Sequence, residues 1–162
     1  MIIRKAEIEK DYDGVWEILS HVISGGDVFS FVPNTPKEDL KKLWFADNMD
    51  TFVALDHLGK VVGSYYVKPN QPGLGSHIAN AGYMVHPDEK GKGIGKLLCQ
   101  HSIAFAREKG YLGMQFNMVV STNESAVKLW KSFGFSIIGT IPQAFRHQRL
   151  GLVDAYIMFK NL

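Results

Sequence analysis

The sequence has a single cysteine and no long apolar segment, and each absence excludes a class of protein. Cys99 has no second cysteine to pair with, so no disulfide can form within the chain. Arg4, Lys5 and Glu7 interrupt the N-terminal stretch that would be apolar in a secretory signal. No apolar run approaches the roughly 20 residues needed to span a bilayer. We therefore expect a cytoplasmic protein with no membrane partner.

An excess of charge of one sign is also absent. The 18 lysines and arginines nearly balance the 16 acidic residues, for a net charge of +2, and they are spread along the chain. Nucleic-acid-binding domains concentrate basic residues on one face, so we expect no nucleic-acid partner. The histidines show no spacing typical of metal ligands, and we expect no metal. Without repeats or linkers, residues 1–162 are predicted to form a single domain.

Hydrophobic periodicity predicts strands and helices throughout the chain. The predicted strands cover residues 2–6, 51–56, 60–67, 78–86, 113–120, 135–141 and 153–160. The predicted helices cover residues 12–23, 36–44, 94–109 and 123–133, and the basic segment 143–149 is predicted to be an exposed loop. Three successive strands imply antiparallel pairing, whereas the strand–helix–strand unit from 78 to 120 implies a right-handed parallel crossover. The expected fold is α/β (α+β), a mixed, largely antiparallel sheet of about six or seven strands flanked by about four helices.

A glycine-rich turn joins the strand ending near Val85 to the helix that follows. Its glycines, which lack a Cβ, let the backbone approach a ligand closely: Gly91, Gly93 and Gly95. The first N–H groups of the helix have no partner within the helix and, with the helix dipole, attract anions. Three lysines add positive charge: Lys90, Lys92 and Lys96. The turn is predicted to bind a pyrophosphate, and the alternative is a solvated turn without a ligand.

Two familiar phosphate-binding motifs do not fit this turn. A P-loop requires Ser or Thr after Gly-Lys, and here Gly95-Lys96 is followed by Leu97. The dinucleotide fingerprint requires a further glycine three residues after Gly95, where Leu98 stands.

The turn resembles motif A of the GNAT superfamily of N-acetyltransferases. That motif has Arg or Gln, two residues, Gly, one residue, then Gly or Ala, after a strand ending in Val-x-Pro. Lys90, Gly93 and Gly95 hold these positions, with lysine in place of the usual Arg or Gln. The segment 123–135 is similar to the family's N-x-x-A-x-x-L-Y-x-x-x-G-F helix, with Trp130 at the tyrosine position. Both segments, with the matching strand order, cover nearly the whole chain.

The resemblance implies that the chain binds acetyl-CoA as co-substrate. The pyrophosphate is expected on the turn 90–95, and the pantetheine arm in a cleft where strands 78–86 and 113–120 splay apart. The expected coenzyme-binding residues are Met84, Val85, Lys90, Gly91, Lys92, Gly93, Ile94, Gly95, Lys96, Asn123, Ala126 and Trp130. The Val85 N–H is expected to stabilise the oxyanion of the tetrahedral intermediate. Asn123 either bonds the pantetheine or caps its helix.

The proton donor and the general base are harder to assign. In many relatives the tyrosine at the position of Trp130 returns a proton to the coenzyme, and an indole N–H is not acidic enough to do so. No Asp or Glu occurs from Lys60 to Pro87, where relatives often place a base. His77 is either a base or a structural, exposed histidine. We expect proton transfer through water or through another residue.

Two asparagines in apolar strands, Asn80 and Asn117, are predicted to serve the acceptor. Their surroundings, 76–82 and 116–123, look similar to the fungal acetyltransferases that detoxify azetidine-2-carboxylate, in which comparable asparagines contact the acceptor. On that resemblance, a small amino acid or a cyclic amine is a plausible substrate. The alternative is an amide pair bonded across the sheet, because a buried amide without a partner costs on the order of 1–3 kcal/mol.

The predicted function is transfer of an acetyl group from acetyl-CoA to the amine of a small molecule, by direct attack in a ternary complex. Two alternatives stay open: acetylation of a protein or peptide, and binding of acyl-CoA by a sensor with little catalytic activity. A deep, narrow acceptor cleft would favour a small amine, and an open groove would favour a peptide. Many relatives dimerise, so a homodimer is also left open.

Overall fold

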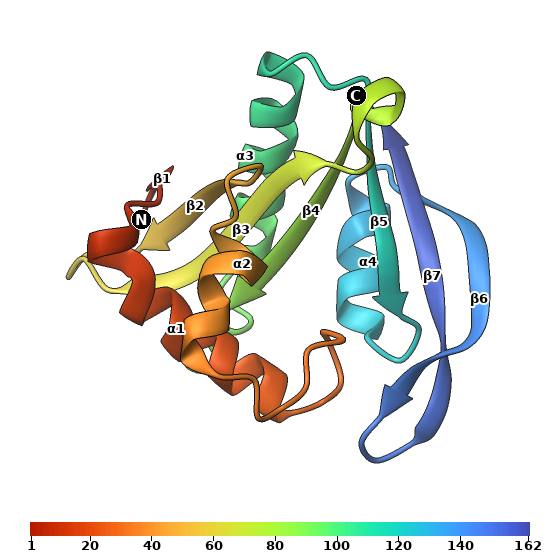
Figure 1. Cartoon of the computed structure of the whole chain (residues 1–162), viewed down its shortest axis with the longest axis horizontal. Coiled ribbons are helices and arrows are strands. Elements are labelled where there is room, and N and C mark those ends of the chain that lie inside the picture. Colours follow the sequence, from red (N-terminus) through yellow and green to blue (C-terminus); the bar gives the residue numbers. More distant parts are fainter.

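The computed structural model describes all residues from 1 to 162, which form a sheet of seven strands covered by helices on both faces (Figure 1). The order of strands across the sheet is β1-β2-β3-β4-β5-β7-β6. The strands are β1 (Ile2–Lys5), β2 (Asp50–Leu55), β3 (Val61–Pro69), β4 (Ile78–Val85), β5 (Gly113–Val120), β6 (Ser136–His147) and β7 (Gly151–Asn161). The helices are α1 (Ile8–Ser24), α2 (Leu40–Trp44), α3 (Ile94–Glu108) and α4 (Glu124–Ser132), with short 3-10 turns η1 (Lys37–Asp39), η2 (Gly73–Gly75) and η3 (Pro87–Glu89).

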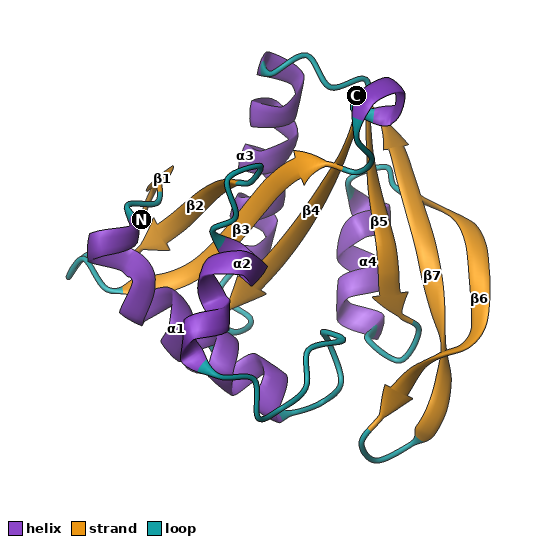
Figure 2. Ribbon diagram, in the orientation of Figure 1, coloured by secondary structure: helices purple, strands orange, loops and turns teal.

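Alternation along the strands divides the core between the two faces of the sheet. On one face α1 and α2 pack against the strands through residues such as Ile18, Trp44 and Met84. On the other face α3 and α4 cover a larger cluster that includes Leu98 and Trp130. Figure 2 shows these two layers of helices with the sheet between them. No helix is both long enough and apolar enough to cross a membrane.

The parallel strands β4 and β5 pair only at their beginnings. Ile78, Ala79 and Asn80 pair with residues 113–115, and the register goes no further. Beyond this point β4 stays paired with β3, and β5 stays paired with β7. The two strands therefore diverge, as Figure 1 shows, and the predicted splayed pair is confirmed.

The largest error in the prediction concerns the basic segment 143–149. Residues 143–147 belong to β6, which forms a long hairpin with β7, and Phe145 and His147 are buried. The alternation of Phe145, Arg146 and His147 is that of a strand with one face covered. The prediction of a loop relied on the charge of Arg146 and Arg149 and overlooked the alternation of buried and exposed residues.

A second error concerns the start of α1, which begins at Ile8 rather than near Tyr12. The first turn carries Glu9 and Asp11 instead of an apolar stripe. Asp11 is buried, where its carboxylate accepts two hydrogen bonds from Arg4, of 2.7 and 2.8 Å, and one from the N–H of Glu7. An ion pair therefore replaces apolar packing in this turn, and hydrophobic periodicity gives no signal for it.

Candidate active site

The glycine turn that begins at Lys90 lies between the end of β4 and the start of α3. Gly91 and Gly93 both have φ of 81°, in the left-handed region that disfavours residues with a side chain. A Cβ on either glycine would meet no protein atom within 4 Å, so the surface of the turn is open. Gly93 caps α3 without a side chain, and the first backbone bond of the helix runs from Leu97 N to Gly93 O. The N–H groups of residues 94–96 therefore have no partner within the helix and suit an anionic ligand.

The charge around this turn differs from the expectation in one respect. The Lys92 ammonium lies 2.8 Å from the carboxylate of Glu89, so its charge is paired. Lys90 and Lys96 are exposed and form no ion pair. The positive field at the turn therefore comes from these two lysines and the helix terminus.

His86 anchors the start of the turn on α1. Its Nδ1 accepts a hydrogen bond from the N–H of Asp88 (3.3 Å), so its Nε2 carries the proton and donates to Glu17 (3.2 Å). Lys60 also bonds this carboxylate, and hydrogen bonds from Lys60 and then His86 hold the pKa of Glu17 below its usual value. The side chain of His86 thus connects the main chain between β4 and the turn to Glu17 on α1.

The main chain of β4 presents hydrogen-bond donors to the gap between β4 and β5. The His86 N–H donates to Val62 O, on the β3 side of the strand. N–H groups alternate in direction along an antiparallel strand, so that of Met84 also faces β3, and those of Tyr83 and Val85 face the gap. The Met84 N–H thus faces β3, and its side chain is buried against α1. Neither group faces the gap, so the structure gives no support to the predicted coenzyme contact of Met84. The sequence analysis did not identify the Tyr83 N–H. Alternate N–H groups of a strand face the same side, so the prediction for Val85 implies the same for Tyr83, two residues earlier.

A cleft of about 120 Å³ lies in the gap. Its lining residues come from β4, β5, α4 and the segment after α1: Val28, Phe29, Ala81, Gly82, Tyr83, Phe116, Met118, Val119, Val120, Asn123, Ala126 and Trp130. The three residues predicted on and before α4 are therefore together at one wall. The residues of the glycine turn lie outside this cleft, at the end of β4.

Asn123 caps α4, as one of its two predicted roles requires. Its Oδ1 accepts hydrogen bonds from Ala126 N (3.3 Å) and Ser125 Oγ (3.1 Å). Its Nδ2 has no partner in the chain and belongs to a residue that lines the cleft. The cap therefore leaves one donor free for a ligand.

Tyr83 and Trp130 share the wall of the cleft, and neither offers an acidic proton to it. Their ring centroids lie 4.8 Å apart. The Tyr83 hydroxyl is bonded to Ser102 Oγ on α3 (2.7 Å), and burial raises its pKa well above the usual value for tyrosine. No charged side chain lines the cleft. Proton transfer here therefore needs water or a group outside the lining.

Replacement of Trp130 by phenylalanine is expected to keep most of kcat, within about threefold of wild type, because the indole supplies packing and no proton. Steady-state rates with acetyl-CoA and a good acceptor, at matched folded fractions from thermal unfolding, would check this. A fall in kcat of a hundredfold or more would show that the indole takes part in the chemistry.

The two predicted asparagines differ in their environments and do not bond each other. Asn80 is buried, and its Nδ2 donates to the main-chain O of Gln115 (3.0 Å), at the last paired position before the strands diverge. Asn117 is exposed, contrary to the expectation of a buried amide. Its Nδ2 donates to Asn70 Oδ1 (2.8 Å), and its Oδ1 accepts from Gln115 Nε2 (3.0 Å). The alternative, in which the two amides bond each other across the sheet, is therefore wrong.

His77 directly precedes β4, next to the stretch where β4 and β5 are paired. Its side chain is exposed, and its main-chain O accepts a hydrogen bond from Leu112 N (2.9 Å). The length of β4 separates it from Val85, so the structural interpretation of His77 fits better than a direct catalytic one.

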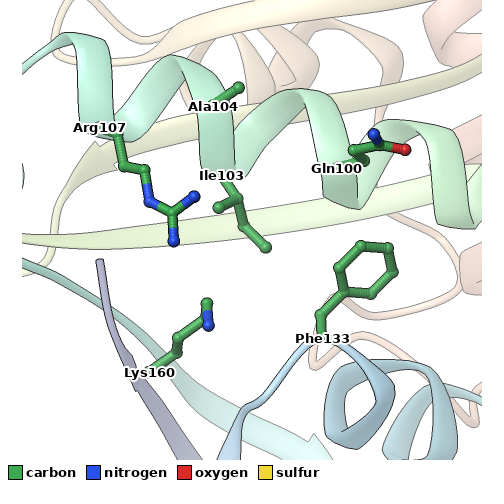
Figure 3. Close-up of a pocket in the computed structure, with 6 residues that line it drawn as sticks. All are labelled: Gln100, Ile103, Ala104, Arg107, Phe133 and Lys160. Atoms are coloured by element: carbon green, nitrogen blue, oxygen red, sulfur yellow. The ribbon is translucent and has the colours of Figure 1, made fainter.

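A larger cavity, of about 350 Å³, lies between α3, the end of α4 and β7. Its lining residues are Gln100, Ile103, Ala104, Arg107, Phe133 and Lys160 (Figure 3). It begins six residues along α3 from Ile94, roughly 9 Å at the rise of a helix. No predicted site residue lines it, and the diverging strands do not reach it.

Comparison with known proteins assigns the family. A model of the acetyltransferase (GNAT) family matches residues 15–135. The chain belongs to this family. It is 38% identical to a GCN5-related N-acetyltransferase from Kribbella flavida, whose structure superposes with a TM-score of 0.94 over 99% of this chain and 97% of that chain.

Two further relatives of this GNAT protein bear on its site. The N-acetyltransferase aca1 of Schizosaccharomyces pombe is 39% identical over 107 residues, which is 64% of this chain and 50% of that protein, so the chain spans about half the length of this curated relative. A phosphinothricin acetyltransferase from Sinorhizobium meliloti, solved in complex with acetyl-CoA, is 19% identical, with a TM-score of 0.88 over 99% of this chain and 88% of that chain. The second relative shares the fold, and its complex shows that this fold can bind acetyl-CoA.

Proposed function

We propose that this GNAT protein transfers an acetyl group from acetyl-CoA to the amine of a small molecule. The observation that supports it most strongly is the divergence of β4 and β5 directly before an open, left-handed glycine turn. Unpaired N–H groups at the start of α3 suit the pyrophosphate, and the gap between the strands suits the extended pantetheine arm. The free Nδ2 of Asn123 lies at the wall of the same gap.

The proposed reaction is a direct attack by the neutral amine on the thioester carbonyl carbon. The new C–N bond forms, the C–S bond breaks, the nitrogen loses its proton to water, and the thiolate leaving group takes a proton from water. The N–H groups of Tyr83 and Val85 face the gap, where they stabilise the negative charge that develops on the carbonyl oxygen. Water is the proposed proton carrier, since no charged side chain lines the cleft.

A contact between the β6–β7 hairpin and the segment after α1 supports a small acceptor. The N–H of Gln148, at the tip of the β6–β7 hairpin, donates to Gly26 O after α1 (3.3 Å). A Cβ on Gly26 would lie 2.3 Å from the Gln148 side chain, so the two segments touch. Val28 and Phe29, from the same segment, line the cleft. An extended peptide would need an open groove here.

Release of free CoA thiol from acetyl-CoA, measured across a panel of primary and secondary amines, tests the proposal. Amino acids, cyclic amines and short peptides belong in the panel, with reactions lacking amine as blanks. Thiol release with small amines at rates well above those with peptides is the expected result. Preference for peptides would support the alternative acceptor, and tight binding of acetyl-CoA without turnover on any amine would support a sensor.

A further inference from the structure

Tyr66 is a half-buried tyrosine that the proposed chemistry does not use. It lies on the face of the sheet covered by α1 and α2, which is the proposed acceptor side. It lies on β3 opposite Gly82 of β4, and Gly82 lines the cleft. Its ring packs against Trp44 in a T-shaped contact, at a centroid distance of 4.8 Å, and Trp44 in turn contacts Phe29, another lining residue. Tyr66 is therefore joined to the wall of the cleft on two sides.

Gly82 is the residue that lets the Tyr66 ring reach this position. A Cβ on Gly82 would lie 2.6 Å from Cε1 of Tyr66 and 2.9 Å from its hydroxyl oxygen, distances that no side chain could occupy without moving the ring. The φ of Gly82 is not in the left-handed region, so backbone conformation does not require glycine here. The missing side chain instead makes room for the phenol on the β4 main chain.

The Tyr66 hydroxyl differs from those of the neighbouring tyrosines because it has no hydrogen-bond partner in the chain. The Tyr65 hydroxyl lies 2.6 Å from His101 Nδ1, and that of Tyr83 is 2.7 Å from Ser102 Oγ. Every fully buried side-chain polar atom in the chain has a hydrogen-bond partner. The Tyr66 hydroxyl has none, so it is not fully buried and is accessible to water or to a ligand. Burial of the ring raises the pKa of Tyr66 to about 12, so the group is a protonated donor at neutral pH.

The position of Tyr66 also decides which substrate it can contact. It projects from the same face as Ser64, toward Trp44 and α1, whereas Trp130 packs on the opposite face with α3 and α4. Lys68, two residues along β3, places its ammonium 5.6 Å from the centroid of the Tyr66 ring and forms no ion pair. Tyr66 and Lys68 therefore give this part of the acceptor face hydrogen-bond donors.

We propose that the Tyr66 hydroxyl binds the acceptor by donating a hydrogen bond to an oxygen atom near the reacting amine. The bonded atom is not the amine nitrogen, because a donated hydrogen bond would occupy the lone pair that attacks the thioester. The acceptor class is thus an amine with a hydrogen-bond-accepting oxygen function close to the nitrogen, and Gly82 is required for its recognition. This inference rests on the proposed function.

The test compares Tyr66→Phe with wild type on matched pairs of amines, such as an amino acid and the amine that lacks its carboxylate. The variant is expected to lower kcat/KM about tenfold or more for the oxygen-bearing member and less than about twofold for the other. The KM for acetyl-CoA and the thermal unfolding midpoint are expected to stay unchanged, since the hydroxyl has no partner in the chain. Tyr65→Phe, next in sequence and facing α3, is the matched control and is expected to leave discrimination between the pairs intact.

Equal discrimination in wild type and Tyr66→Phe would overturn the assignment. Calorimetric binding of the same amines to the protein saturated with CoA separates this from failure of the proposed function. Amines that bind wild type without being acetylated would contradict the proposed function, and the loss or retention of their affinity in Tyr66→Phe would still decide the role of Tyr66. A wild-type protein that binds no member of the panel would overturn both.

Discussion

Replacement of Gly93 by valine is expected to weaken the binding of acetyl-CoA at least about 100-fold while the chain still folds. At φ of 81° a β-branched residue is strained by about 1–2 kcal/mol, and the turn will shift to relieve that strain. The shift would misalign the N–H groups at the start of α3, each of which contributes about 1.5–3 kcal/mol to a charged partner. A loss of about 3 kcal/mol corresponds to the stated factor.

Gly59 provides a matched control for this variant. It has the same φ of 81°, and a Cβ added to it would likewise meet no atom within 4 Å, but it lies in the turn between β2 and β3. Gly59→Val is expected to lower the unfolding midpoint about as much as Gly93→Val does, and to leave the affinity for acetyl-CoA unchanged. Calorimetric titration of both variants measures the difference. Similar affinities for the two would show that the turn at Lys90 is not the coenzyme site.

The features that could be predicted from the sequence are those with a local cause. The glycine turn follows from Pro87 and the glycines after it, and the cap of α4 follows from Asn123 before an amphipathic stretch. The parallel crossover follows from the helix between two strands, because such units have one hand. Resemblance to the family then supplied the ligand that we propose for the turn.

Features that depend on the register between distant strands could not be predicted. Asn117 lies between apolar residues, which suggested burial, but the pairing of β5 with β7 shifts between Phe116 and Val119. Such an irregularity breaks the alternation of faces, and Asn117 and Met118 are both exposed. The contact of Gln148 with Gly26 is equally non-local, so it was not visible in the sequence either.

Replacement of Asn80 by alanine is expected to lower kcat about 100-fold and to change the affinity for acetyl-CoA less than about threefold. The Nδ2 of Asn80 donates a hydrogen bond to Gln115 O, whereas its Oδ1 has no partner in the chain. Alternation along β4 places Asn80 on the same face of the sheet as Met84, which is the proposed acceptor side. That oxygen can accept a hydrogen bond from an N–H of the amine and direct its lone pair at the thioester. Loss of this orientation affects the chemical step more than coenzyme binding. Asn117→Ala is expected to lower turnover less, because this residue is exposed and its amide is bonded to Asn70.

A structural role for Asn80 makes a different prediction, and the two can be separated. If the hydrogen bond to Gln115 O only holds β4 and β5 together where they begin to diverge, its loss would widen the gap that we propose for the pantetheine arm. Coenzyme affinity, turnover and the unfolding midpoint would then fall together. Gln115→Ala is the matched control at the position paired with Asn80. It keeps the carbonyl that Asn80 bonds and removes the side chain that bonds Asn117. Equal losses of turnover and coenzyme affinity in Asn80→Ala, with Gln115→Ala near wild type, would assign Asn80 to holding β4 and β5 together rather than to the acceptor.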